Sequence, residues 1–94
     1  MSVRLTARAF ADLSSILDYL SSRSLKGSES VRRSIQKTTE LIGEYPRSGR
    51  ESGEEDLRVL PAGRYPYLIY WSVIAGEAWI VHIRDARRRP REVE

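Results

Sequence analysis

The stretch from Tyr67 to Arg84 constrains the fold of this 94-residue chain more than any other part of it. Residues 67–74 and residues 78–84 are both rich in β-branched and aromatic side chains, which favour pleated and largely buried strands. Between them, Ala75-Gly76-Glu77 includes a glycine, which readily adopts the positive φ that a short hairpin loop requires. The stretch therefore predicts a β-hairpin at the centre of the domain.

The second strand of this hairpin leads directly into a basic segment. Residues 85–90 read Asp-Ala-Arg-Arg-Arg-Pro, so a hydrophobic sheet ends in concentrated positive charge. Alternation along the strand predicts two faces, made of Trp79, Val81 and Ile83 on one side and of Ile80, His82 and Arg84 on the other.

A short strand and two amphipathic helices are predicted upstream. Ser2–Leu5 alternates like a strand, and Thr6 is suited to cap a helix from Ala7 to about Ser22. Gly27 is expected to terminate the first helical pattern, and Ser28 to cap a second helix that reaches about Glu44. Apolar side chains recur at three- and four-residue spacing in both helices, namely Phe10, Leu13, Ile16, Leu17 and Leu20, then Val31, Ile35, Thr38, Ile42 and Tyr45. Off this stripe lie Arg32, Arg33 and Lys37, which are predicted to face solvent.

The remaining segment supplies a long loop and one more strand. Residues 46–56 are polar, contain glycine and lack periodicity, so they predict a loop that is long for a small domain. Leu57–Leu60 predicts a strand. The order β-α-α-β-β-β then predicts an α+β fold with an antiparallel sheet. Its three C-terminal strands form a meander, and the N-terminal helical hairpin covers one face.

The length and composition of the chain predict one domain over residues 1–94. The chain has no cysteine, no apolar segment of membrane-spanning length and no signal-peptide pattern, so we expect a cytoplasmic protein without a thiolate metal site. Net charge is only +3, yet 14 of the 16 basic residues are arginine. Arginine presents a planar fork that suits carboxylates and phosphates, which indicates an anionic partner.

Several segments, taken in order, resemble the RelE/ParE superfamily of type II toxin–antitoxin toxins. They are the opening strand and helix, Pro46-Arg47-Ser48-Gly49, residues 63–71 (Gly-Arg-Tyr-Pro-Tyr-Leu-Ile-Tyr-Trp) and the closing segment 81–90. The last of these is more similar to the ParE, or plasmid stabilisation, branch. The resemblance implies a toxin that a small acidic antitoxin neutralises in a hetero-oligomeric complex, without a cofactor or metal.

The resemblance also implies a target. ParE-type toxins inhibit DNA gyrase, whereas RelE-type toxins cut messenger RNA on the ribosome; a third alternative is a homologue that binds antitoxin but is no longer toxic. RelE-like members use basic residues and a C-terminal tyrosine, but Glu94 stands in the corresponding place here and Pro66 and Tyr67 occupy the region of an expected basic residue. Whether the chain is an enzyme stays open, and these departures favour binding over cutting.

Candidate site residues follow from these alternatives. For target binding we expect arginines, namely Arg58, Arg64, Arg84, Arg87, Arg88 and Arg89. If the chain is RelE-like, His82 and Arg84 are the catalytic candidates, because the ordinary histidine pKa lies near neutrality; a packed histidine is the other interpretation. The aromatic strand residues suit either stacking on bases or a core, and the acidic run Glu51, Glu54, Glu55 and Asp56 suits a solvated loop better than a metal site.

Overall fold

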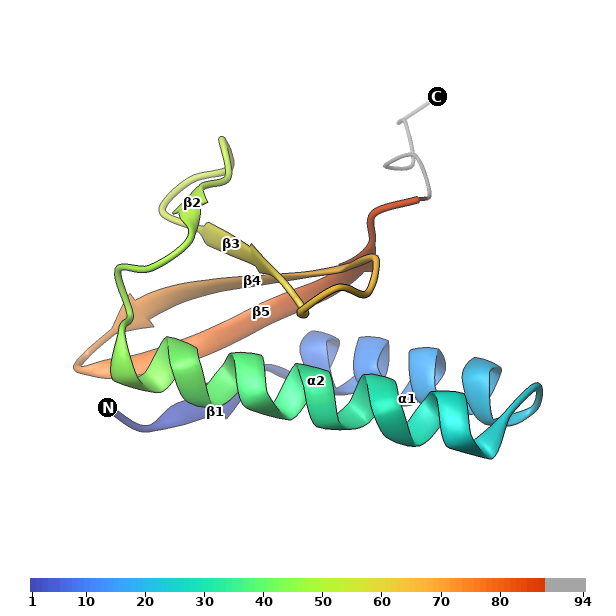
Figure 1. Cartoon of the computed structure of the whole chain (residues 1–94). Coiled ribbons are helices and arrows are strands. Elements are labelled where there is room, and N and C mark those ends of the chain that lie inside the picture. Colours follow the sequence, from blue (N-terminus) through green and yellow to red (C-terminus); the bar gives the residue numbers. More distant parts are fainter. Residues whose placement is uncertain (88–94) are drawn as a thin grey trace, which may run out of the picture.

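A computed structural model describes residues 1–87 of the chain. This part contains helices α1 (Ala7–Ser21) and α2 (Leu25–Glu44) and strands β1 (Val3–Leu5), β2 (Arg50–Glu51), β3 (Arg58–Pro61), β4 (Tyr67–Ile74) and β5 (Glu77–Asp85). Within residues 1–87 the five strands form one sheet in the order β1-β5-β4-β3-β2. Both helices lie on the same face of that sheet (Figure 1). The predicted α+β architecture is therefore confirmed.

The sheet is mixed. Strands β3, β4 and β5 form the predicted antiparallel meander. Strand β1 adds to the far edge of β5 in parallel, with Val3 opposite Ala78 and Leu5 opposite Ile80. A parallel neighbour requires a long crossover, which the intervening helices and meander supply. The expectation of an antiparallel sheet was wrong for this one pair, because alternation in a three-residue strand does not encode its direction.

Strand β5 contains an extra residue. Tyr70 of β4 pairs with His82, but the next residue, Trp71, pairs with Ile80, so Val81 is a bulge. The bulge reverses the alternation, and Ile83 faces the core together with Ile80. The predicted grouping of Ile83 with Trp79 and Val81 was therefore wrong.

Helix α2 begins earlier than predicted. Ser24 is its N-cap, and the Ser24 hydroxyl accepts the Gly27 backbone N–H at 3.0 Å. Gly27 thus lies in the first turn of α2, so the prediction that it terminates the first helix was wrong. Ser28 is buried and donates its hydroxyl to the Leu17 carbonyl of α1 at 3.3 Å, which joins the two helices. A serine cap is worth about 1 kcal/mol, similar to the cost of one helical glycine, so the earlier start is tolerated.

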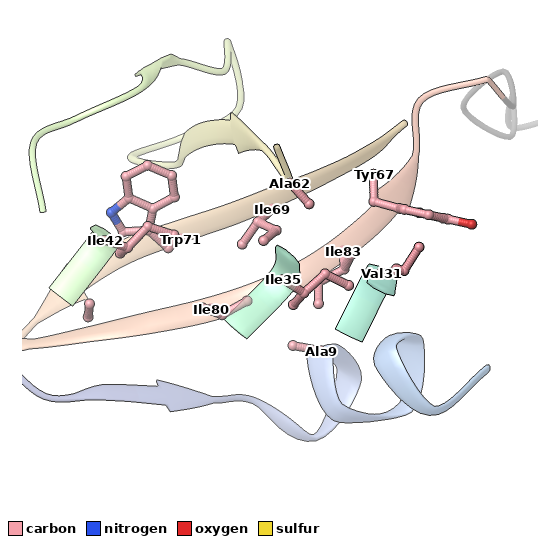
Figure 2. Close-up of a cluster of buried hydrophobic side chains, with 11 residues drawn as sticks. Ala9, Val31, Ile35, Ile42, Ala62, Tyr67, Ile69, Trp71, Ile80 and Ile83 are labelled. Carbon is pink, nitrogen blue, oxygen red and sulfur yellow. The ribbon is translucent and has the colours of Figure 1, made fainter. Parts of the chain in front are cut away.

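The core lies between the helices and the sheet (Figure 2). Two residues of the predicted apolar stripes lie outside it, since Phe10 is 64% exposed and Tyr45 is 60% exposed. Ala9 is fully buried, whereas its bulkier neighbour Phe10 faces solvent. The reason is that α1 starts against the sheet, where the Thr6 N–H donates to the Ile80 carbonyl. None of the helices in residues 1–87 combines the length and the apolar character that crossing a membrane requires.

The segment after α2 is anchored to the sheet by three backbone carbonyls. The Trp71 indole N–H donates to the Pro46 carbonyl at 3.0 Å, and the Arg58 guanidinium donates to the carbonyls of Ser48 and Gly49 at 2.9 and 3.3 Å. Strand β2 follows at once, so the predicted irregular loop contains a short strand. The Pro-Arg-Ser-Gly segment that resembles the family therefore has a structural role.

Replacing Gly49 with alanine is expected to destabilise the fold by about 2 kcal/mol or more. Gly49 has a φ of 73°, and an added Cβ would lie 2.5 Å from the Val59 carbonyl oxygen and 2.9 Å from the Trp71 ring. Gly53→Ala is the matched control, because Gly53 also has positive φ, at 88°, but its Cβ would meet nothing within 4 Å. The control should cost only about 1 kcal/mol. Urea unfolding measures both, and equal losses would contradict the proposed close contact.

Candidate functional site: the α1–β5 hollow

A hollow of about 690 Å³ lies between α1 and the C-terminal half of β5. We call it the α1–β5 hollow. It forms because β1 pairs with β5 only as far as Ile80, and beyond that point α1 runs along the strand's edge. Its charged and polar lining includes Arg8, Asp12 and Tyr19 of α1, His82 and Arg84 of β5, and the following Arg87.

Side chains of α1 close the edge of β5 inside this hollow. The Thr6 hydroxyl donates to the Val81 carbonyl at 2.9 Å and accepts the Ala9 N–H as the helix cap. Six residues after Thr6, the Asp12 carboxylate accepts the Ile83 backbone N–H at 3.0 Å. An unpaired strand edge is a template for another strand. A strand that approached β5 here would have to displace Asp12 before it could bond to Ile83.

His82 lies on the sheet face opposite the helices. It is only 6% exposed, and its ring stacks on Tyr70 with centroids 4.1 Å apart. The loop after β2 brings a Glu54 carboxylate oxygen to 3.5 Å from His82 Nε2. Burial lowers the pKa of His82 below its ordinary value of 6.5, and the charge of Arg8 acts in the same direction; Glu54 and Asp12 oppose both. The lowered pKa favours the neutral ring, and the ring is packed in the manner of a structural histidine.

Arg84 and Arg87 project from the end of β5 and have different environments. The Arg84 guanidinium donates to the Tyr70 hydroxyl at 2.9 and 3.3 Å. Arg87 forms a bidentate pair with Asp85, at 3.1 and 2.9 Å, and this pairing raises the pKa of Arg87. The Arg87 side chain nevertheless remains 64% exposed. It is therefore accessible to an anionic partner that competes with Asp85.

The structure separates the predicted site residues. His82, Arg84 and Arg87 line the same hollow. Arg58 lies on β3 and holds backbone carbonyls, whereas Arg64 lies on the turn between β3 and β4. Arg88 and Arg89 lie outside the described residues.

Sequence reasoning missed the contribution of α1 to the hollow. Four of its polar residues recur at spacings of four, three and four, which places them on one helix face beside the apolar stripe: Arg8, Asp12, Ser15 and Tyr19. This spacing is present in the sequence, but it lies beside the apolar stripe, which is the stronger helical signal.

The structure also bears on the aromatic strand residues and on the acidic loop as a metal site. Tyr67, Tyr70 and Trp71 are all buried, so packing accounts for them without stacked bases. Across the part of the chain that the structure describes, no three histidine or acidic side chains gather closely enough to hold a metal ion. The hollow is lined by guanidinium groups, two tyrosines and two carboxylates, which suit recognition of a charged, irregular surface.

The free energy of unfolding is expected to fall as the pH drops below about 6.5. Because the pKa of folded His82 is lowered, the unfolded chain binds the proton more readily. The stabilisation from neutral His82 is present above pH 6.5 and is lost as the pH falls through the folded-state pKa. Urea unfolding between pH 5 and 8 measures this, and His82→Gln should remove this component of the pH dependence. An NMR titration that gave His82 a pKa above 6.5 would contradict the assignment.

Comparison with known proteins agrees with this architecture. The sequence model for the ParE toxin of type II toxin–antitoxin systems (parDE) matches residues 3–90. The chain is 34% identical over 85 residues to Toxin RelE2 of Caulobacter vibrioides, covering 88% of this chain and 92% of that protein. It also resembles a solved chain of the chromosomal ParDE toxin–antitoxin system from P. aeruginosa, with a TM-score of 0.80 and 25% identity over 90% of this chain and 95% of that one. The chain therefore belongs to the ParE toxin family of type II toxin–antitoxin systems.

Proposed function

We propose that this protein is a toxin that inhibits DNA gyrase and is neutralised by a cognate acidic antitoxin. Membership of the ParE family carries the proposal, since the family model spans residues 3–90. The toxin acts in the cytoplasm, where it forms a hetero-oligomer with its antitoxin and requires no cofactor.

The chemistry of the α1–β5 hollow supports binding over cutting. Cleavage of RNA by its own 2′-hydroxyl requires a base and an acid that reach the substrate. His82 is stacked and shielded, with Glu54 beside Nε2, and Arg84 is directed to the Tyr70 hydroxyl. Arg87 and Arg8 are exposed, and their charges are suited to bind an anionic surface. A stoichiometric inhibitor acts by binding its target in this way.

Purified toxin should inhibit supercoiling by DNA gyrase at micromolar concentration, and Arg87→Gln should weaken inhibition about tenfold. The reason is the loss of a charge-assisted contact worth on the order of 1.5–3 kcal/mol. Arg50→Gln is the control, because Arg50 is an exposed arginine on β2 and does not line the hollow. Inhibition that both variants retained fully would remove the hollow from the proposed target surface. Unchanged supercoiling with wild-type toxin would refute gyrase as the target.

A second candidate function is ribosome-dependent cleavage of messenger RNA. The observation that favours it is the printed name of the relative from Caulobacter vibrioides, Toxin RelE2. On this alternative, His82 and Arg84 act on the RNA. Primer extension on translated messages tests it: new 5′ ends that vanish in His82→Gln would establish cutting and overturn the gyrase proposal. If the toxin affects neither gyrase nor messages and yet binds its antitoxin, it is a non-toxic homologue.

A further inference from the structure

The tip of the β4–β5 hairpin extends past the end of β3 (Figure 1). Strand β3 pairs with β4 only as far as Arg58, which lies opposite Trp71. Strand β4 continues to Ile74, so within residues 1–87 no strand lies beside Ser72–Ile74 on the β3 side. The edge of the sheet is therefore open at this point.

The chain that precedes β3 turns away from this edge. The Ser52 N–H donates to the Leu57 carbonyl at 3.0 Å, and the Leu57 N–H donates to the carbonyls of Glu54 and Glu55. Leu57 would be the next residue to lie opposite β4, but its backbone groups form their hydrogen bonds inside this turn. The fold itself therefore leaves the edge open.

Val73 presents its backbone N–H and C=O groups to the open edge. The residues that flank the two-residue turn Ala75-Gly76 form a hydrogen-bonded pair, as in other hairpins with such a turn. Hydrogen-bonded and non-hydrogen-bonded pairs alternate in an antiparallel ladder, so the next pair, Val73 and Ala78, directs its backbone groups outward. Ala78 agrees with this alternation, because its N–H donates to the Ser2 carbonyl on the β1 side at 3.0 Å. On the other side of the hairpin, the backbone groups of Val73 face the space beyond the end of β3.

A cavity of about 530 Å³ adjoins this edge. Ser72 and Val73 line it together with the buried Trp71, and the Val73 side chain is 46% exposed. Carboxylates outnumber guanidinium groups among its charged lining residues, which are Glu51, Glu54, Glu55, Asp56, Arg47 and Arg58. The Arg58 guanidinium already donates to two backbone carbonyls. The cavity therefore suits cationic side chains on an extended backbone.

We propose that the open edge of β4 at Ser72–Ile74 accepts an extended basic peptide segment of a partner protein. The segment adds to the sheet in line with β3 and bonds through its main chain to Val73. Its lysine or arginine side chains pair with the carboxylates of Glu55 and Asp56 across the cavity. This surface is separate from the α1–β5 hollow, because the two linings share no residue. A basic partner also differs from the acidic antitoxin, so the inference does not depend on the proposed function.

Amide hydrogen exchange, measured by NMR with and without a short peptide of alternating lysine and valine, tests the strand pairing. The peptide should slow exchange of the Val73 amide about fivefold or more, because this N–H gains an acceptor. The amides of Ser72 and Ile74 should change little, since the alternation of the ladder directs them to β5. They are internal controls in the same spectrum.

Fluorescence anisotropy with the labelled peptide separates strand addition from charge attraction. A peptide with proline in place of valine has the same charge but cannot form a paired strand, so it should bind about tenfold more weakly. The variant Glu55→Gln/Asp56→Asn should bind the lysine–valine peptide about fivefold more weakly. Glu40→Gln/Glu44→Gln is the matched control, because these exposed α2 carboxylates do not line the cavity. It should lose less than about twofold.

Several results would overturn the proposal. Wild-type protein that does not bind the lysine–valine peptide would refute it outright. Equal losses in the two double variants, or equal affinity for the proline peptide, would indicate general attraction to lysine. Unchanged exchange at Val73 in the bound state would place the peptide elsewhere, and tighter binding of a glutamate–valine peptide would exclude a basic segment. A protein dimer that the peptide dissociates in analytical ultracentrifugation would assign the edge to a second copy. Circular dichroism verifies that each variant is folded.

Discussion

The pairing of β4 with β5 determines where the candidate site residues of this protein lie. The bulge at Val81 shifts the register by one residue halfway along the pair. Ile83 then faces the helices and joins the core, whereas His82 and Arg84 face outward against Tyr70. A one-residue shift exchanges the two faces of a strand. Without the bulge, Ile83 would face outward and the charged end of β5 would be presented differently to α1.

Arginine has several roles in this fold, and their environments distinguish them. Arg58 donates to backbone carbonyls and secures the segment after α2. Arg84 is directed to a buried phenol, while Arg87 pairs with Asp85 at an exposed position. An arginine-rich composition therefore does not translate directly into a surface for anions. In the described residues, Arg87 is better suited to a partner than Arg58 or Arg84, because its side chain stays 64% exposed despite its pair with Asp85.

Two hydrogen bonds join the helices to the sheet region. The Asp12 carboxylate of α1 accepts the Ile83 backbone N–H of β5, and the Ser34 hydroxyl of α2 donates to the Ala62 carbonyl of the β3–β4 turn. The α1–β5 hollow combines one helix with the edge of the sheet, so its shape depends on how α1 packs against β5.

The sequence by itself determined both helices, strands β1, β3, β4 and β5, the α+β class and the family resemblance, because apolar periodicity, turn glycines and ordered motifs are local properties. It also located the hairpin of β4 and β5 and the basic segment that follows it. Only the tertiary structure decided the parallel direction of β1, the bulge at Val81, the meeting of Arg8 with His82 and Arg84, and the separation of Arg58 from them. These features depend on contacts between residues far apart in the chain. Local pattern carries no information about which of several compatible registers and neighbours gives the best-packed core.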